Sequence, residues 1–265
     1  STSSFMQEIA DYSLLFAPLV LWTYRFDRDE AFLKRVYPYV KGAFEYFCGY
    51  ENERGLLENV TEKWNLVDWP ENLRDGYDFP LTNPIGNGVH NVINAFWIGF
   101  LKAFDELSGI MGLPVTEKAK RTEKNYIEAF YNEETGLFCD SPAKKHSAIH
   151  SNVLPLYFGV KKNDSAFVKN AVKFIEEKRL TSMGVYMSYF ALAALKKNGE
   201  EEKAVALATD KNAWLNMIAE GGTATFEAWG KEQKWNTSLF HPWAVAPLIV
   251  FSKIDLQKTE KENII

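Results

Sequence analysis

The stretch VHNVINAFWIGFLKAFDELS, residues 89–108, decides the fold class. Its apolar side chains recur three or four positions apart, which is the spacing of one face of an α-helix. We therefore predict a long helix over 89–108. The apolar face of this helix comprises Val89, Val92, Ile93, Phe96, Phe100, Leu101 and Phe104.

Helical spacing extends over most of the chain, and no alternating strands or hairpin patterns are seen. We expect Pro18 and Pro38 to kink or split the first two helices, and Thr116 to cap a later one. The chain is thus predicted to be all-α, with nine or ten helices. The other predicted helices cover residues 5–25, 29–48, 116–131, 147–159, 164–178, 185–198, 200–218 and 241–253.

A weak internal repeat indicates how these helices are arranged. NERGLLE (52–58) and NEETGLF (132–138) each follow an aromatic-rich helix end and lie about eighty residues apart, enough for two helical hairpins. In each copy the glycine, Gly55 or Gly136, can take a left-handed backbone, and the leucine after it can pack back on the helix. Such hairpins can stack into a ring of inner and outer helices with a cleft at one end. The alternative is an open solenoid.

Composition limits the partners and cofactors. The net charge is -5 and no basic stripe is present, so a nucleic-acid partner is not expected. The apolar run 14–22 is far shorter than the ~20 residues that span a bilayer, and no signal peptide opens the chain, so we expect a soluble protein. The start, STSS, reads like a cut inside a longer protein.

No feature of the sequence predicts a cofactor. It contains no glycine-rich phosphate loop, nucleophile elbow or cysteine–histidine pairing. Cys48 and Cys139 lack the spacing of metal ligands. His146 and His150 could share a helix face, but a metal site would require a third ligand, so no metal is expected. We expect His150 instead to begin a buried helix and to bond a backbone group.

The segment GGTATFEAWGKEQKWNTSLFHPW, residues 221–243, follows neither a helical nor a strand period. It places one carboxylate, Glu227, between Phe226 and Trp229, and one histidine, His241, close to Trp243. A carboxylate can transfer protons, and aromatic rings can stack on the apolar face of a pyranose. The segment therefore predicts a sugar-cleaving site. Alternatively, its aromatic side chains only cap the core.

The long irregular tract 59–87 is a second candidate, because long loops in compact domains are usually functional. Its motif WNLVDWP (64–70) sets Trp69, a plate for sugar stacking, beside Asp68, an acceptor for sugar hydroxyls. Alternatively, Trp69 anchors the loop. For Asp75, which precedes Gly76, we favour a turn, and the same alternative applies to Asp78.

With these residues in hand, the chain resembles the catalytic domain of bacterial α-L-rhamnosidases, a family of inverting glycoside hydrolases. TATFEAW (223–229) is similar to the family's Thr-Thr-aromatic-Glu-x-Trp motif. His241 looks equivalent to the histidine that follows it. LVDW (66–69) and DYS (11–13) resemble a Phe/Leu-x-Asp-Trp motif and an Asp-Tyr/Trp-Ser motif. The stretches 150–159 and 187–199 are also similar, so the resemblance covers nearly the whole chain.

The resemblance implies an (α/α)6 toroid whose pocket holds a terminal rhamnose, a carbohydrate substrate. It implies that Glu227 is the general base that activates water. Asp11 would bind sugar hydroxyls; from the residues alone it could equally be an N-cap. The substrate-binding residues implied in this way are Asp11, Asp68, Trp69, Trp229, His241 and Trp243.

The sequence departs from the family in two respects. The general acid's Cys-Pro-x-Arg-x-Glu motif has no match in 1–265. The toroid also needs twelve helices, more than we predict. We therefore expect 1–253 to be part of the catalytic domain, incomplete at its N-terminal side, and 254–265 to be a tail leading to a further region. The acid would lie outside this chain, leaving the chain weakly active or inactive on unactivated rhamnosides.

Two other functions remain open at this stage. The missing acid favours a sugar-binding toroid that has lost catalysis. The second alternative is a different glycosidase on the same toroid, such as an unsaturated uronyl hydrolase or a glucoamylase-like enzyme. Uronyl recognition would require basic residues near the cleft, and the candidate loops offer only Arg74, Lys231 and Lys234.

Overall fold

The computed structural model describes residues 8–77 and 88–252. These contain ten α-helices and one two-stranded sheet. The prediction of an all-α chain is confirmed. The helices are α1 (Ala10–Asp27), α2 (Glu30–Cys48), α3 (Asn91–Ile110), α4 (Lys118–Phe130), α5 (His150–Tyr157), α6 (Ser165–Lys178), α7 (Val185–Lys197), α8 (Glu201–Ala208), α9 (Trp214–Ala219) and α10 (Ala246–Phe251).

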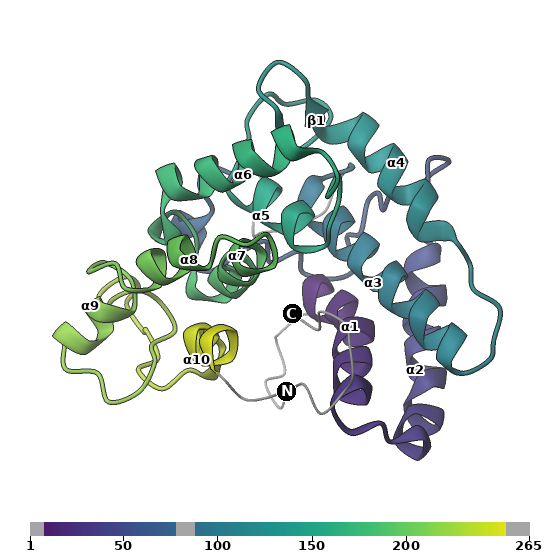
Figure 1. Cartoon of the computed structure of the whole chain (residues 1–265), viewed down its shortest axis with the longest axis horizontal. Coiled ribbons are helices and arrows are strands. Elements are labelled where there is room, and N and C mark those ends of the chain that lie inside the picture. Colours follow the sequence, from purple (N-terminus) through teal and green to yellow (C-terminus); the bar gives the residue numbers. More distant parts are fainter. Residues whose placement is uncertain (1–7, 78–87, 253–265) are drawn as a thin grey trace.

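The helices form an arc of inner and outer members (Figure 1). Along the inside, α1 packs against α3, α3 against α5, α5 against α7 and α7 against α10. Each of the first four inner helices is followed by a partner that packs on it: α2, α4, α6 and α8 respectively. This is the predicted alternation of inner and outer helices in an α/α toroid.

Sequence composition explains which helices lie inside. Ten of the thirteen residues of α7 are buried, so this helix meets neighbours on nearly all sides. In α4, by contrast, only Ala119, Thr122, Tyr126 and Phe130 are buried, a single stripe with helical spacing. An apolar stripe requires one packing partner, whereas a helix that is apolar all round requires several.

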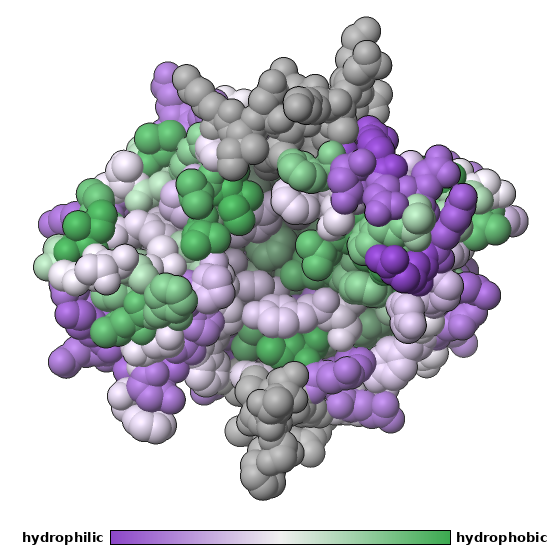
Figure 2. Space-filling model, turned by 90° about the horizontal axis from the view of Figure 1, so that it is seen from below, coloured by the Kyte–Doolittle hydropathy of each residue, from purple (hydrophilic) through white to green (hydrophobic). Residues whose placement is uncertain are grey.

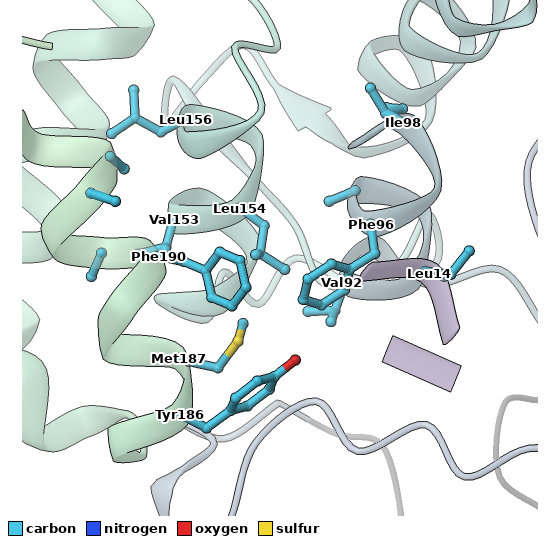
Figure 3. Close-up of a cluster of buried hydrophobic side chains, with 14 of the residues drawn as sticks. Leu14, Val92, Phe96, Ile98, Val153, Leu154, Leu156, Tyr186, Met187 and Phe190 are labelled. Carbon is cyan, nitrogen blue, oxygen red and sulfur yellow. The ribbon is translucent and has the colours of Figure 1, made fainter. Parts of the chain in front are cut away.

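The inner helices meet in a common core. Figure 3 shows Phe96 of α3, Leu154 of α5 and Phe190 of α7 turned toward one another, with Leu14 of α1 to one side. Phe96 and Phe190 pack edge to face, with ring centroids 5.5 Å apart. Residues 91–108 of the predicted helix thus lie in α3 and build the centre of the molecule.

Gly99 lies where α3 passes close to another aromatic ring. A Cβ atom at this position would lie 2.2 Å from the Phe158 ring. We predict that Gly99→Ala lowers the free energy of unfolding by about 1–3 kcal/mol, because interiors tolerate overpacking poorly. In Gly42→Ala, on the exposed side of α2, the new methyl meets nothing within 4 Å. This control should gain about 0.5–1 kcal/mol from helix propensity. Urea unfolding measures both, and equal effects would contradict the packing argument.

The internal repeat forms the same local structure twice. Gly55 and Gly136 both have left-handed backbones, with φ values of 69° and 66°. In the first copy Leu57 is fully buried and Glu51 pairs with it across a β-bridge. In the second copy the pairing extends to β1 (Tyr131–Asn132) and β2 (Leu137–Phe138), which are antiparallel. The sequence reading missed this hairpin, since two residues per strand are too few for an alternating pattern.

Four helix predictions need correction. The predicted helix 200–218 is two helices, α8 and α9, separated by a turn in which Asp210 pairs with Arg179. Of the predicted 241–253, only Ala246–Phe251 is α-helical, after a 3-10 turn at Pro242–Ala244. Thr116 is not the N-cap of the helix that follows it, because α4 begins at Lys118 and Glu117 takes that position. Pro18 and Pro38 lie inside α1 and α2, and neither helix is split. The predicted tail 254–265 and the turn at Asp78 lie outside the described residues.

Exposed apolar side chains occur at both ends of the arc. On α1 they are Leu19, Trp22 and Phe26, and on α10 they are Leu248 and Ile249. Figure 2 views the molecule from this side and shows apolar patches around a hollowed centre. Within 8–77 and 88–252, no helix is both long and apolar enough to cross a membrane.

Candidate active site

Glu227 lies in the irregular segment between α9 and α10 and contacts the loop that carries Trp69. Its Oε1 accepts a hydrogen bond of 3.1 Å from the indole Nε1 of Trp69. Its Oε2 accepts one of 2.9 Å from the backbone amide of Ser238 and is 2.9 Å from Lys234 Nζ. Three donors from two separate loops therefore hold one carboxylate.

The electrostatics favour the ionised form of this glutamate. Burial is the largest influence and by itself would raise the pKa of Glu227. The hydrogen bonds from Lys234 and Ser238, the positive charge of Lys234 and, at the acid pH where Glu227 titrates, the charge of protonated His241 outweigh it and leave the pKa below its ordinary value. Near neutral pH the side chain is a carboxylate, which can accept a proton.

Aromatic rings surround this carboxylate. Trp243 donates its indole N–H to the backbone carbonyl of Glu227, at 3.2 Å. The imidazole of His241 lies against Trp243, with ring centroids 4.5 Å apart, and burial lowers its pKa, so it is neutral near pH 7. The ring of Tyr186, at the start of α7, also packs on Trp243, with ring centroids 5.7 Å apart.

Asp68 is buried beneath Trp69 and joins three segments. Its Oδ1 accepts the Trp69 amide at 2.8 Å. Its Oδ2 accepts His150 Nε2 and the Gly184 amide, both at 2.7 Å. A Cβ at Gly184 would lie 2.3 Å from Asp68 Oδ1 and from the Trp69 carbonyl, so only glycine allows this approach. Asp68 thus fixes the Trp69 loop to α5 and to the start of α7.

His150 therefore differs from its prediction. It does begin a buried helix, α5, but it bonds the carboxylate of Asp68 rather than a backbone group. A carboxylate 82 residues away could not be identified as its partner from sequence. His146 pairs with Asp140 instead, so the two histidines do not share a site. The described parts of the chain hold no cluster of three or more His, Cys, Asp or Glu suited to a metal ion.

Asp11 is not the N-cap of α1, because that position belongs to Ile9. It is fully buried, and its Oδ2 accepts the amide of Val67 at 3.1 Å. Its Oδ1 has no hydrogen-bond partner among the residues described. Burial raises its pKa to about 7. Asp11 therefore supports the Trp69 loop from beneath and keeps one oxygen available.

Trp229 has the surroundings of a core residue. It is 3% exposed, donates its indole N–H to the Met183 carbonyl at 2.7 Å and packs edge to face on Trp214. These contacts fit the alternative given above, in which the aromatic side chains of the segment 221–243 only cap the core. Its sugar-binding role stays a prediction, as do those of the other named residues.

The structure thus joins most of the predicted residues through a chain of contacts. Asp11 bonds the loop at Val67, and Asp68 and Trp69 lie in the same loop. Trp69 bonds the carboxylate of Glu227. Trp243 bonds the backbone of Glu227 and packs against His241. Tyr186 and Lys234 are additional members of this group, and the sequence had identified Lys234 only as a basic residue near the cleft. Nothing in a period or motif marked Lys234, which lies seven positions after Glu227 in an irregular loop.

One cavity in the molecule lies apart from this group. It has a volume of about 480 Å³ and lies between α1 and α2, with Tyr12, Phe16, Tyr46 and Lys63 among its lining residues. Neither Glu227 nor Trp69 borders it. We therefore place the candidate site at the Glu227–Trp69 contact and not in this cavity.

Comparison with known proteins agrees with this fold. Residues 7–252 match the family model of the bacterial alpha-L-rhamnosidase six-hairpin glycosidase domain. A rhamnosidase from Klebsiella oxytoca with rhamnose bound has a similar structure, with a TM-score of 0.71 and 16% identity over 91% of this chain. An alpha-L-rhamnosidase from Streptomyces avermitilis in complex with L-rhamnose has a TM-score of 0.67 and 17% identity over 90%.

A mannosylglycerate hydrolase from Thermus thermophilus is also similar, with a TM-score of 0.62 and 14% identity over 94% of this chain and 78% of its own. The chain spans 46% of the Klebsiella protein and 22% of the Streptomyces protein. No curated protein matches it. Since the family model covers nearly the whole chain, this protein belongs to the bacterial α-L-rhamnosidase six-hairpin glycosidase domain family.

Proposed function

We propose that this chain carries the base-bearing part of a glycoside hydrolase that removes terminal α-L-rhamnose with inversion. The observation that supports it most is the ionised Glu227, held by Trp69, Ser238 and Lys234 beside aromatic rings. An inverting hydrolase requires such a base to activate water on the face opposite the leaving group.

In this mechanism Glu227 Oε1 takes a proton from water as the water oxygen bonds to the anomeric carbon. The glycosidic bond breaks, and its electron pair leaves with the aglycone oxygen. Natural aglycones require a general acid to protonate that oxygen. We propose that the acid comes from outside residues 1–265, because no match to the acid motif is found within them.

The aromatic members are assigned to the sugar. Trp69 and Trp243 would pack on its apolar surface, while His241, which is neutral, would exchange hydrogen bonds with its hydroxyls. Asp11 Oδ1 would accept a further hydroxyl. Since Asp11 is shielded from solvent, a sugar reaches it only when neighbouring side chains move.

A neutral sugar fits these contacts better than a uronate. Arg74 is buried and donates to the carbonyls of Leu66 and Asp68. Lys231 bonds the carbonyl of Glu220, and Lys234 is paired with Glu227. Lys63, the other basic residue of the tract 59–87, pairs with Glu8. All four basic residues of the candidate loops are thus engaged, which disfavours the unsaturated uronyl hydrolase alternative.

Substrates with different leaving groups test the proposal. α-L-Rhamnosyl fluoride needs little acid assistance, so we expect this chain to hydrolyse it, whereas methyl α-L-rhamnoside should react poorly or not at all. Proton NMR should show β-L-rhamnose as the first product, as inversion requires. Retention of the α configuration would contradict the mechanism. Rhamnose binding without any hydrolysis of the fluoride would favour the sugar-binding alternative.

A further inference from the structure

Lys234 is fixed against Glu227 by its own turn. Besides the 2.9 Å contact with Glu227 Oε2, its Nζ donates to Asn236 Oδ1 at 2.9 Å and to the Asn236 carbonyl at 3.3 Å. Thr237 Oγ1 closes the turn by donating to the Lys234 carbonyl. The side chains of Lys234 and Glu227 are each 13% exposed, so water screens this ion pair little.

The two oxygens of Glu227 are consequently unequal. Oε2 accepts from two donors of the turn 234–238, the ammonium of Lys234 and the amide of Ser238. Oε1 accepts only from Trp69 among the hydrogen bonds of the described residues. A carboxylate oxygen has two lone-pair sites, so Oε1 keeps one for a water molecule.

The same ammonium also lies over the indole of Trp69, 5.6 Å from its ring centroid. Lys234 therefore contacts both the Glu227 carboxylate and Trp69, the residue that donates a hydrogen bond to Glu227 Oε1. A lysine in this place orients the carboxylate and stabilises its charge at once.

We propose that Lys234 is a positioning residue that keeps Glu227 ionised and turned so that Oε1 faces the attacking water. This inference rests on the proposed function, because it assigns a task within that reaction. Lys234 itself transfers no proton. The other charged or titratable side chain that acts on Glu227 is His241, which faces it from the segment leading to α10.

The decisive measurement does not depend on turnover. With glutamate labelled at the carboxyl carbon, ¹³C NMR follows the titration of Glu227, assigned by the signal that Glu227→Gln lacks. We expect the pKa of Glu227 to shift upward in Lys234→Met, which removes the charge but keeps an apolar stem. Lys234→Arg should leave the pKa low. An unchanged titration in Lys234→Met would overturn the proposal.

Kinetics supply the second readout. In Lys234→Met, the acid limb of the pH–rate profile for α-L-rhamnosyl fluoride should move to higher pH, with a loss in kcat and little change in KM. Lys234→Arg should restore the limb. Lys231→Met is the matched control, because this neighbouring lysine bonds the Glu220 carbonyl instead, and its profile should equal that of the parent. An equal shift in both methionine variants would contradict the inference.

The two proposals can fail separately. If Glu227→Gln retained full activity, the general-base proposal would be wrong, yet the NMR titration would still report whether Lys234 controls the carboxylate. If the titration were unaffected while Glu227→Gln abolished turnover, only the role of Lys234 would be rejected.

Discussion

Glu227→Gln is expected to lower kcat for α-L-rhamnosyl fluoride by about 10²–10⁴-fold, the range that a general base contributes. Glutamine keeps an oxygen that can accept the Trp69 N–H but has no basic carboxylate. The fold should persist, because the carboxylate lies at the surface of the core and its neighbours are loop residues. Rates and circular dichroism of both proteins measure the two effects.

The control for this substitution is Glu220→Gln, which changes a carboxylate in the adjacent turn. Glu220 accepts from the Asn216 side chain and the Lys231 amide and does not contact Glu227 in the described contacts. Its activity should equal that of the parent. Azide, an anionic nucleophile that needs no base, should restore turnover of the fluoride in Glu227→Ala. A lack of rescue, with the fold intact, would argue that Glu227 serves another step.

Asp11→Asn is expected to change how stability depends on pH. The carboxyl pKa is about 7 in the folded protein, raised by burial, against 3.8 as the ordinary value. Below pH 3.8 the Asp11 carboxyl is protonated in both the folded and the unfolded state, so it does not lower the free energy of unfolding. Between 3.8 and 7 only the unfolded chain loses the proton, so stability falls as pH rises. Above pH 7 the accumulated cost is about 4 kcal/mol. Asparagine cannot ionise, so its variant lacks this fall.

Urea unfolding of parent and Asp11→Asn from pH 4 to pH 8 tests this expectation. The difference between the two free energies of unfolding should move in favour of the variant up to about pH 7 and then level off. Any fixed cost of burying the amide is the same at every pH and does not affect the slope. Asp164→Asn is a control whose difference should stay flat over this range, because the hydrogen bond from Lys161 and the helix cap hold the pKa of Asp164 below its ordinary value of 3.8. A difference between parent and Asp11→Asn that also stays constant with pH would refute the prediction.

Much of the fold could be predicted because it follows from local patterns. The apolar face of 89–108 predicted α3, and the repeated Asn-to-Leu motif predicted two left-handed glycines that the structure confirms. The break between α8 and α9 could not be predicted. Asp210, in the turn between the two helices, pairs with Arg179, 31 residues away, and the sequence around Asp210 does not identify so distant a partner.

The same distinction applies to the candidate site. Glu227 and Trp69 could be selected because each lies in a motif of the resembled family. The sequence could not predict the hydrogen bond between these two residues, the pairing of His150 with Asp68 or the contact of Lys234 with Glu227. Each joins side chains through the folded backbone, so no spacing along the chain encodes it. Asp11 is an example: its position in the sequence is typical of a helix cap, but in the structure its carboxyl group is buried.

The hydrogen bond between Trp69 and Glu227 also has a consequence for folding, because 158 residues separate its partners. Closing so long a loop costs conformational entropy that local helix formation does not. We expect helical signal to return early in refolding and the indole environment of Trp69 to become native last, so that the proposed site would be complete only in the final folding step.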